Sequence, residues 1–223
     1  MCGRFSLTAD PVTIQEAFPW LSVPSQITPR YNIAPSQPIA VVPNDGKNFV
    51  DFFVWGLIPS WAKDPKLGSR MINARGETLA EKASFRAAYK RRRCLVLADG
   101  FYEWVKQPGD NKKTPYFIHL ETHNPFAFAG LWEIWYAPDG SEIKSATIIT
   151  TEPNEKLANL HNRMPVILNE GDYATWLAPE EQRGNDLDIL LQPFPAAAMQ
   201  YYPVSTTVNN PRNDTPACII PAN

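Results

Sequence analysis

The middle of the chain reads Cys94-Leu95-Val96-Leu97-Ala98-Asp99-Gly100-Phe101-Tyr102-Glu103-Trp104. Its first five residues form an apolar run that is far too short to span a bilayer and is typical of a buried strand. A second strand is predicted over Phe101–Lys106, and strand alternation places Phe101 and Glu103 on one face. The stretch therefore predicts two consecutive strands and a partly buried carboxylate.

Further strands are predicted on both sides of this stretch. They are Ile39–Val42, Val50–Leu57, Tyr116–Leu120, Phe126–Trp135, Glu142–Thr150 and Met199–Val204, with turns at Asn44-Asp45-Gly46, Gly109-Asp110-Asn111 and Asp139-Gly140. Short helices are predicted from the Asp10 cap through Phe18, over residues 77–92 with Ala80, Ala83 and Ala87 facing inward, and at Asn154–Leu160 and Gly171–Leu177. Residues 19–37 are interpreted as a proline-containing loop.

Strands outnumber helices in this pattern, and no strand–helix alternation with a glycine-rich phosphate loop is present. The fold class that we expect is α+β, with mainly antiparallel curled sheets approaching a β-barrel and short flanking helices. Since there is no internal repeat or low-complexity linker, residues 1–223 are predicted to form a single domain.

Composition limits the classes of function. The 223 residues carry a net charge of −2, so the whole-chain balance does not favour nucleic acid. Cys2, Cys94 and Cys218 include no CxxC pair, so we expect no disulfide framework, no metal site and no cofactor. With no signal pattern, the sequence predicts a cytoplasmic protein, associated with the nucleoid if the source is bacterial, with no membrane partner.

The N-terminus offers unusual chemistry. Removal of Met1, by a methionine aminopeptidase or by the protein itself, would leave Cys2 with a free α-amine and a thiol on adjacent carbons. The amine can condense with an aldehyde, and the tethered thiol can then close a five-membered thiazolidine ring. The alternative from Cys2 alone is an ordinary buried structural cysteine.

Other candidate residues occur in small motifs, and each has a structural alternative. Asn73 and Arg75 lie two apart and share a face of an extended segment, where Arg75 could instead form a salt bridge. Glu103 is a candidate proton donor or acceptor if desolvation raises its pKa, or else an outward-facing carboxylate. His161 is predicted in a loop, and Trp61 is either a stacking platform or a core residue.

Taken in order, the motifs resemble the SOS response-associated peptidase (SRAP) family. The matching segments are Met1-Cys2-Gly3-Arg4-Phe5, Arg30-Tyr31-Asn32-Ile33-Ala34-Pro35, Trp55-Gly56-Leu57-Ile58-Pro59-Ser60-Trp61, Ile72-Asn73-Ala74-Arg75-Gly76-Glu77-Thr78, the central stretch from Cys94 to Trp104, His161-Asn162-Arg163-Met164-Pro165 and Pro203-Val204-Ser205. Two departures are Met164, where some relatives carry a basic residue, and a looser match over residues 77–92.

The resemblance implies an enzyme that senses abasic sites in single-stranded DNA. It would remove Met1 autocatalytically and form a thiazolidine crosslink through Cys2. The catalytic set implied is Cys2 as nucleophile, Asn73 holding the terminal amine, Glu103 shuttling protons and His161 stabilising the opened sugar. The DNA-binding set implied is Arg4, Asn32, Pro35, Trp61, Arg75, Trp104, Thr150 and Arg163. We expect the protein to act as a monomer.

Two other functions remain open from the sequence. An N-terminal-nucleophile amidohydrolase would also expose a terminal cysteine, but it leaves the arginines and tryptophans without a role. A non-catalytic single-stranded DNA-binding module would keep those residues and make Cys2 incidental.

Overall fold

The structure is a computed structural model that describes residues 2–107, 109, 112–182 and 186–222. One sheet contains five antiparallel strands in the order β12-β8-β7-β1-β2. Their bounds are Phe5–Leu7 for β1, Arg30–Ile33 for β2, Gly100–Lys106 for β7, Lys113–Leu120 for β8 and Met199–Pro203 for β12. The beginning of the chain is therefore an inner strand of this sheet, placed between β7 and β2.

The second sheet closes on itself. Its strand order is β11-β10-β4-β3-β6-β9, and β9 also pairs with β10, so that five strands form a ring. The ring strands are β3 (Pro38–Pro43), β4 (Asp51–Trp55), β6 (Arg93–Ala98), β9 (Phe126–Tyr136) and β10 (Glu142–Thr151), and the short strands β5 (Asn73–Arg75) and β11 (Met164–Pro165) pair with β10. The expected α+β class with curled, mainly antiparallel sheets is confirmed.

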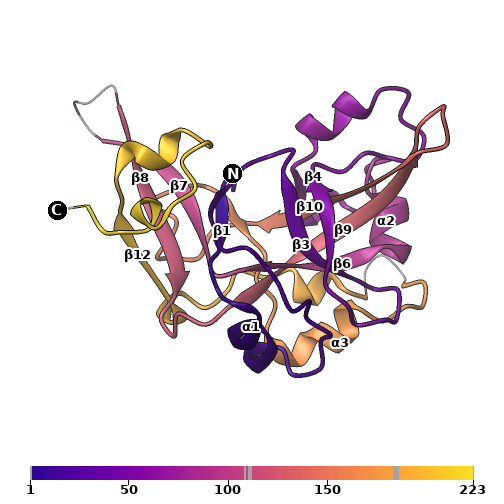
Figure 1. The fold of residues 1–223 in the computed structure, drawn as a ribbon, viewed down its shortest axis with the longest axis horizontal. Coiled ribbons are helices and arrows are strands. Elements are labelled where there is room, and N and C mark those ends of the chain that lie inside the picture. The colour runs from indigo at the N-terminus through magenta and orange to yellow at the C-terminus, as the bar shows by residue number, and fades with distance from the viewer. Residues whose placement is uncertain (1, 108, 110–111, 183–185, 223) are drawn as a thin grey trace.

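The two sheets share one apolar core. In Figure 1 the closed sheet lies on the right, β8 and β12 lie on the left, and β1 lies between them. Phe5 of β1 packs edge-on against Trp55 and Phe128 of the closed sheet, at ring-centroid distances of 5.0 and 5.9 Å. Every residue of β6 is buried, as its apolar run predicted.

Helices are short and lie at the periphery. Helix α1 spans Pro11–Ala17, and Asp10 caps it by accepting a hydrogen bond from the Thr13 amide, as predicted. The others are α2 (Arg86–Arg91), α3 (Tyr173–Trp176) and the 3₁₀ helices η1 (Pro65–Arg70), η2 (Gly76–Thr78), η3 (Glu170–Asp172), η4 (Asp188–Leu190), η5 (Ala196–Ala198), η6 (Thr206–Asn209) and η7 (Pro216–Cys218). None of the described helices is long and apolar enough to cross a membrane.

Several helix and loop predictions were wrong. The helix over residues 77–92 reduces to η2 and α2, and Ala80, Ala83 and Ala87 are exposed. Leu79 and Tyr89 enter the core instead, because their larger side chains bury more apolar surface than alanine does. Residues 154–160 form turns rather than a helix, and residues 19–37 contain β2. Of the turn at Gly109-Asp110-Asn111, Asp110 and Asn111 lie outside the described residues.

One buried cation joins several peripheral segments to the core. Arg93 is fully buried, and its guanidinium donates to carbonyl oxygens at the ends of α2 and α3. The acceptors are Tyr89 at 3.2 Å, Lys90 at 2.6 Å, Trp176 at 2.9 Å, Glu180 at 3.2 Å and Ala178. A single side chain thus satisfies terminal carbonyls that the short helices leave without partners.

We predict that Arg93→Met lowers the free energy of unfolding by at least about 3 kcal/mol, since several buried carbonyls would lose their donor. Denaturant unfolding measures this change. Arg91→Met is the control, because the Arg91 side chain is 62% exposed and pairs with a half-exposed Glu181. Equal effects of the two substitutions would contradict the structural role assigned to Arg93.

Candidate functional site

Backbone pairing determines where the N-terminal residues lie. Phe5 is opposite Phe101 and Ser6 is opposite Gly100 in the β1–β7 ladder, and the Tyr102 amide donates to the Arg4 carbonyl at 3.0 Å. Continuing this antiparallel register places Gly3 opposite Glu103. The register therefore brings Cys2 alongside Glu103 and Trp104 in the middle of β7.

Asp99 fastens the other end of β1. Its carboxylate accepts hydrogen bonds from the Ser6 hydroxyl at 2.6 Å, the Thr8 hydroxyl at 2.7 Å, the Ala9 amide at 3.0 Å and the Thr8 amide. Because these donors span four residues of the first segment, Asp99 fixes the C-terminal end of β1 and so limits where the preceding Cys2 can lie.

Cys2 is fully buried beside a side-chain amide. The Asn73 Nδ2 group donates to the Cys2 carbonyl at 2.7 Å, and the Cys2 Sγ lies 3.8 Å from the Arg4 carbonyl. Burial raises the pKa of the Cys2 thiol, and the nearby Glu103 carboxylate acts in the same direction. In the encoded chain, with Met1 attached to its nitrogen, the Cys2 thiol is therefore held in its neutral form.

Asn73 has a second polar atom at this place. It opens β5, which runs parallel to β10 with Asn73 opposite Ile148. Its Oδ1 atom is buried and has no hydrogen-bond partner among the described residues. A buried acceptor next to Cys2 is suited to bind a donor that arrives during chemistry, such as an ammonium or a hydroxyl.

Glu103 and His161 form the titratable part of the site. Glu103 is 6% exposed, and burial raises the pKa of its carboxyl, although the charge of nearby His161 opposes this shift. His161 lies in the predicted loop, and its Nδ1 accepts the Arg163 amide at 3.0 Å. In the neutral ring the proton is therefore on Nε2.

Arg4 is held by neutral acceptors and an aromatic ring. Its Nη1 donates to Asn32 Oδ1 at 2.6 Å and to the Val208 carbonyl at 2.8 Å, and its guanidinium lies 5.6 Å from the Trp104 ring centroid. The Trp104 indole donates in turn to Asn209 Oδ1 at 2.7 Å. Since no carboxylate among the described residues forms an ion pair with Arg4, its charge remains available to an anion.

Arg163 is arranged differently. It forms a two-pronged ion pair with Glu77, and the Arg163 guanidinium lowers the pKa of that carboxyl. Its Nη2 also donates to the Thr150 carbonyl. Arg75 is exposed on β5 opposite Thr150, so both arginines lie at the end of β10.

The remaining predicted residues divide by exposure. Trp61 is 59% exposed, and Pro35 is half-buried just after β2. Asn32 and Thr150 are fully buried, and their predicted contact with DNA stays a prediction. Asn32 uses its amide to bind Arg4 and the carbonyls of residues 208, 210 and 213, and Thr150 supports Arg163. In this structure the two side chains therefore help to position Arg4 and Arg163.

Sequence reasoning missed Glu77, Asn209 and Asp214. The Asp214 carboxylate accepts the amides of Tyr31 and Asn32 and pairs with Arg30, which fastens the C-terminal segment against β2. No local pattern could identify these residues, because their partners are more than 80 residues away in the chain.

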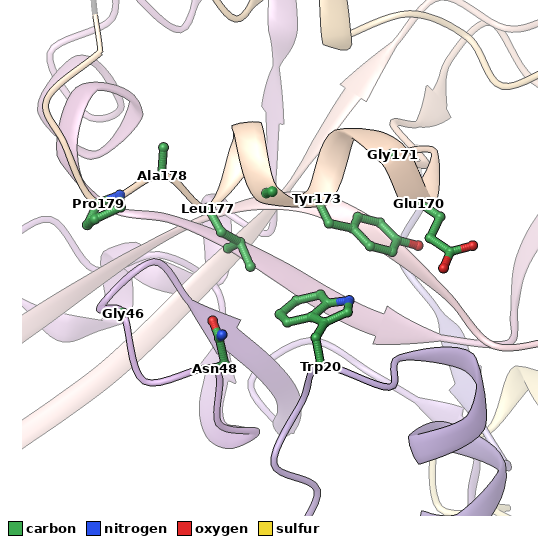
Figure 2. Close-up of a pocket in the computed structure, with 10 residues that line it drawn as sticks. Trp20, Gly46, Asn48, Glu170, Gly171, Tyr173, Leu177, Ala178 and Pro179 are labelled. Carbon is green, nitrogen blue, oxygen red and sulfur yellow. The ribbon is translucent and has the colours of Figure 1, made fainter.

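The cavity in Figure 2 is separate from this set. It has a volume of about 730 Å³ and lies between Trp20 and α3, and Glu170 is the one charged residue among the described residues that line it. The lining includes none of the predicted site residues. No group of three or more histidine, cysteine, aspartate or glutamate side chains suited to a metal ion occurs within the described ranges.

Comparisons with known proteins agree on one family. The family model described as "SOS response associated peptidase (SRAP)" matches residues 1–211. The chain is 46% identical to "Abasic site processing protein YoqW" of Bacillus subtilis over 222 residues, covering 98% of this chain and 99% of that protein. It is 34% identical to "Abasic site processing protein HMCES" of Rattus norvegicus over 271 residues, covering 100% of this chain and 76% of that protein.

A solved structure shares the fold. A crystal structure of a protein from Bacteroides thetaiotaomicron aligns with a TM-score of 0.87 at 26% identity and covers 100% of both chains.

We predict that Glu103→Gln stabilises the folded protein at neutral pH. Because the folded-state pKa of Glu103 is raised, the unfolded chain loses this proton first as the pH rises above about 4.5. The wild type therefore loses stability relative to Glu103→Gln between that pH and the raised pKa, and the difference vanishes in acid. Denaturant unfolding from pH 4 to 8 measures it.

Glu181→Gln provides the opposite control, since Arg91 lowers the pKa of the exposed Glu181 carboxyl. A stability difference between wild type and Glu103→Gln that does not change with pH would contradict a raised pKa of the buried Glu103 carboxyl.

Proposed function

Because the chain belongs to the SOS response associated peptidase (SRAP) family, we propose that it processes abasic sites in DNA. We propose further that it acts on single-stranded DNA and forms a covalent thiazolidine with the lesion through Cys2. The observation that carries this proposal is the contact of Asn73 with the Cys2 carbonyl just before β1, with Glu103 near enough to raise the pKa of the Cys2 thiol. The nucleophile, an amide and a buried acid then meet at one point.

The first step is hydrolysis of the Met1–Cys2 peptide bond. Water adds to the Met1 carbonyl carbon, the C–N bond breaks, and a proton passes to the Cys2 nitrogen. We propose Glu103 as the group that moves these protons, since burial raises the pKa of its carboxyl and so favours the protonated form that can donate. The Asn73 hydrogen bond holds the Cys2 carbonyl still during this step.

Crosslinking then uses both groups of the freed Cys2. An abasic sugar is mainly a closed hemiacetal, so an acid and a base are needed to expose its aldehyde. The Cys2 amine adds to the aldehyde carbon and a water molecule leaves, which forms an imine. The thiol adds across the C=N bond, so that sulfur bonds to carbon and the thiol proton passes to nitrogen. Glu103 and His161 supply the proton transfers, His161 through its Nε2.

Cations and aromatic side chains are the groups that would bind the DNA strand. Arg4, Arg75 and Arg163 would bind phosphates, while Pro35 and Trp104 would wedge beside the lesion and Trp61 would stack on a base. Such contacts read no base edges and require unpaired nucleotides, which supports single-stranded DNA as the partner. We propose that the chain acts as one domain and as a monomer, since a single chain supplies every residue of the proposed site.

We predict that purified wild-type protein lacks Met1. After incubation with an abasic single-stranded oligonucleotide, its mass should increase by the mass of the oligonucleotide minus one water molecule, and this adduct should persist in denaturant. Intact-mass spectrometry measures both changes at once. Cys2→Ala should form no adduct, whether or not it retains Met1. An adduct of equal yield with Cys2→Ala would contradict the proposal, and turnover of small amides without a DNA adduct would favour the amidohydrolase.

We predict that Glu103→Gln slows adduct formation by roughly 10²- to 10⁴-fold, the usual contribution of a general acid–base group. Because this substitution is expected to stabilise the fold, a slower rate cannot be attributed to unfolding. Single-turnover crosslinking followed on denaturing gels measures the rate. Glu16→Gln on α1 is the matched control, and equal rates for all three proteins would exclude Glu103 from the chemistry.

A further inference from the structure

A positively charged hollow lies beside the segment that leads into the site. Its volume is about 680 Å³, and its lining includes Trp61, Lys63, Asp64, Lys66 and Arg70. The three cations are exposed, and none of them forms an ion pair with a described residue. The one carboxylate, Asp64, accepts the Lys66 amide at 2.9 Å as the cap of η1. The hollow is thus cationic in a chain whose net charge is −2.

The loop that forms the hollow is firmly anchored. At its base the Gly56 and Gly68 backbones touch so closely that a Cβ on Gly56 would lie 2.5 Å from the Gly68 oxygen. The Leu57 amide donates to the Met71 carbonyl at 3.1 Å, which closes the loop. The backbone that carries the three cations is therefore held in place by contacts at the base of the loop.

Apolar residues of this loop pack against the protein beneath it, with the exception of Trp61. Ala62 and Leu67 pack with Ile58 against Trp135, and the Trp135 indole donates to the Ala62 carbonyl at 2.7 Å. Trp61 has no part in this packing and remains 59% exposed. An exposed indole on an anchored loop, surrounded by unpaired cations, offers a base a stacking surface and its phosphates a counter-charge.

Chain geometry links the hollow to the reacting centre. Arg70 ends η1 only three residues before Asn73, so their Cα atoms lie at most about 11 Å apart. The cavity in Figure 2, by contrast, has the carboxylate of Glu170 as the one charged group among its described lining residues, and a carboxylate would repel a phosphate. Of these two hollows, only the one at Trp61 has the charge that nucleic acid requires.

We infer that Trp61, Lys63, Lys66 and Arg70 form a subsite for the single-stranded DNA that flanks the lesion on one side. A base stacks on Trp61, and the phosphates that follow it lie against Lys63, Lys66 and Arg70. This inference rests on the proposed function for the identity of the strand and adds three cations to the residues assigned to it. The subsite takes undamaged nucleotides, so its occupation does not require the covalent step.

The test is the salt dependence of binding to an undamaged single-stranded oligonucleotide, followed by fluorescence anisotropy. Removing two phosphate contacts with the double substitution Lys66→Gln and Arg70→Gln should reduce the slope of log K against log salt by about 1.4. The matched control is Lys82→Gln with Arg86→Gln, which removes two exposed charges elsewhere and should keep the wild-type slope. An unchanged slope in the first variant, or an equal decrease in the control, would overturn the subsite.

A second measurement separates this inference from the proposed function. Initial rates of adduct formation are compared for abasic oligonucleotides truncated to about two nucleotides on the 5′ or on the 3′ side of the lesion. Wild-type protein should lose rate on truncation of one side only, and the Lys66→Gln, Arg70→Gln variant should be insensitive to that truncation. If no protein forms an adduct, the proposed covalent function fails, and the salt dependence still decides the subsite.

Discussion

Backbone hydrogen bonds from β1 to β7 hold the beginning of the chain inside a sheet, where most proteins have a loosely ordered end. The register of Phe5 with Phe101 and the four hydrogen bonds accepted by Asp99 determine how far Cys2 extends along β7. Chemistry at a chain terminus requires such a restraint, because a free end would occupy many positions and reach a reactive carbonyl in few of them. The proposed aminothiol chemistry depends on this pairing more than on any side chain.

Burial acts in the same direction on the two ionisable groups nearest this end. It favours the neutral thiol of Cys2 and the neutral carboxyl of Glu103, since each charged form would lose hydration. Asn73 adds an orienting donor without adding charge. In the proposed reaction both groups therefore start in their neutral forms, from which each can release a proton to the reacting atoms.

Residues near the two ends of the chain meet around Arg4 and Trp104, which are proposed to contact DNA. Asp214 binds the amides of β2, and the Val208 carbonyl and Asn209 receive donors from Arg4 and Trp104. These contacts restrict the rotamers of Arg4 and Trp104 before any ligand arrives, so less conformational entropy is lost on binding. Positive charge is also concentrated locally, at Arg4, Arg75 and the Trp61 loop, although the chain as a whole is slightly acidic.

The sequence by itself determined the eight longer strands β3, β4, β6 to β10 and β12, the cap of α1, the loop position of His161 and the ordered motifs that identify the family, but not the short strands β1, β2, β5 and β11. These follow from apolar periodicity, turn residues and local hydrogen bonding, which act over a few residues. Closure of the β3–β4–β6–β9–β10 ring, burial of Asn32 and Thr150, and the pairing of Arg163 with Glu77 were decided only by the tertiary structure. Residues 77–92 show the reason: helical spacing was present, but competition for core volume selected Leu79 and Tyr89 over the alanines, and that competition involves partners far away in the chain.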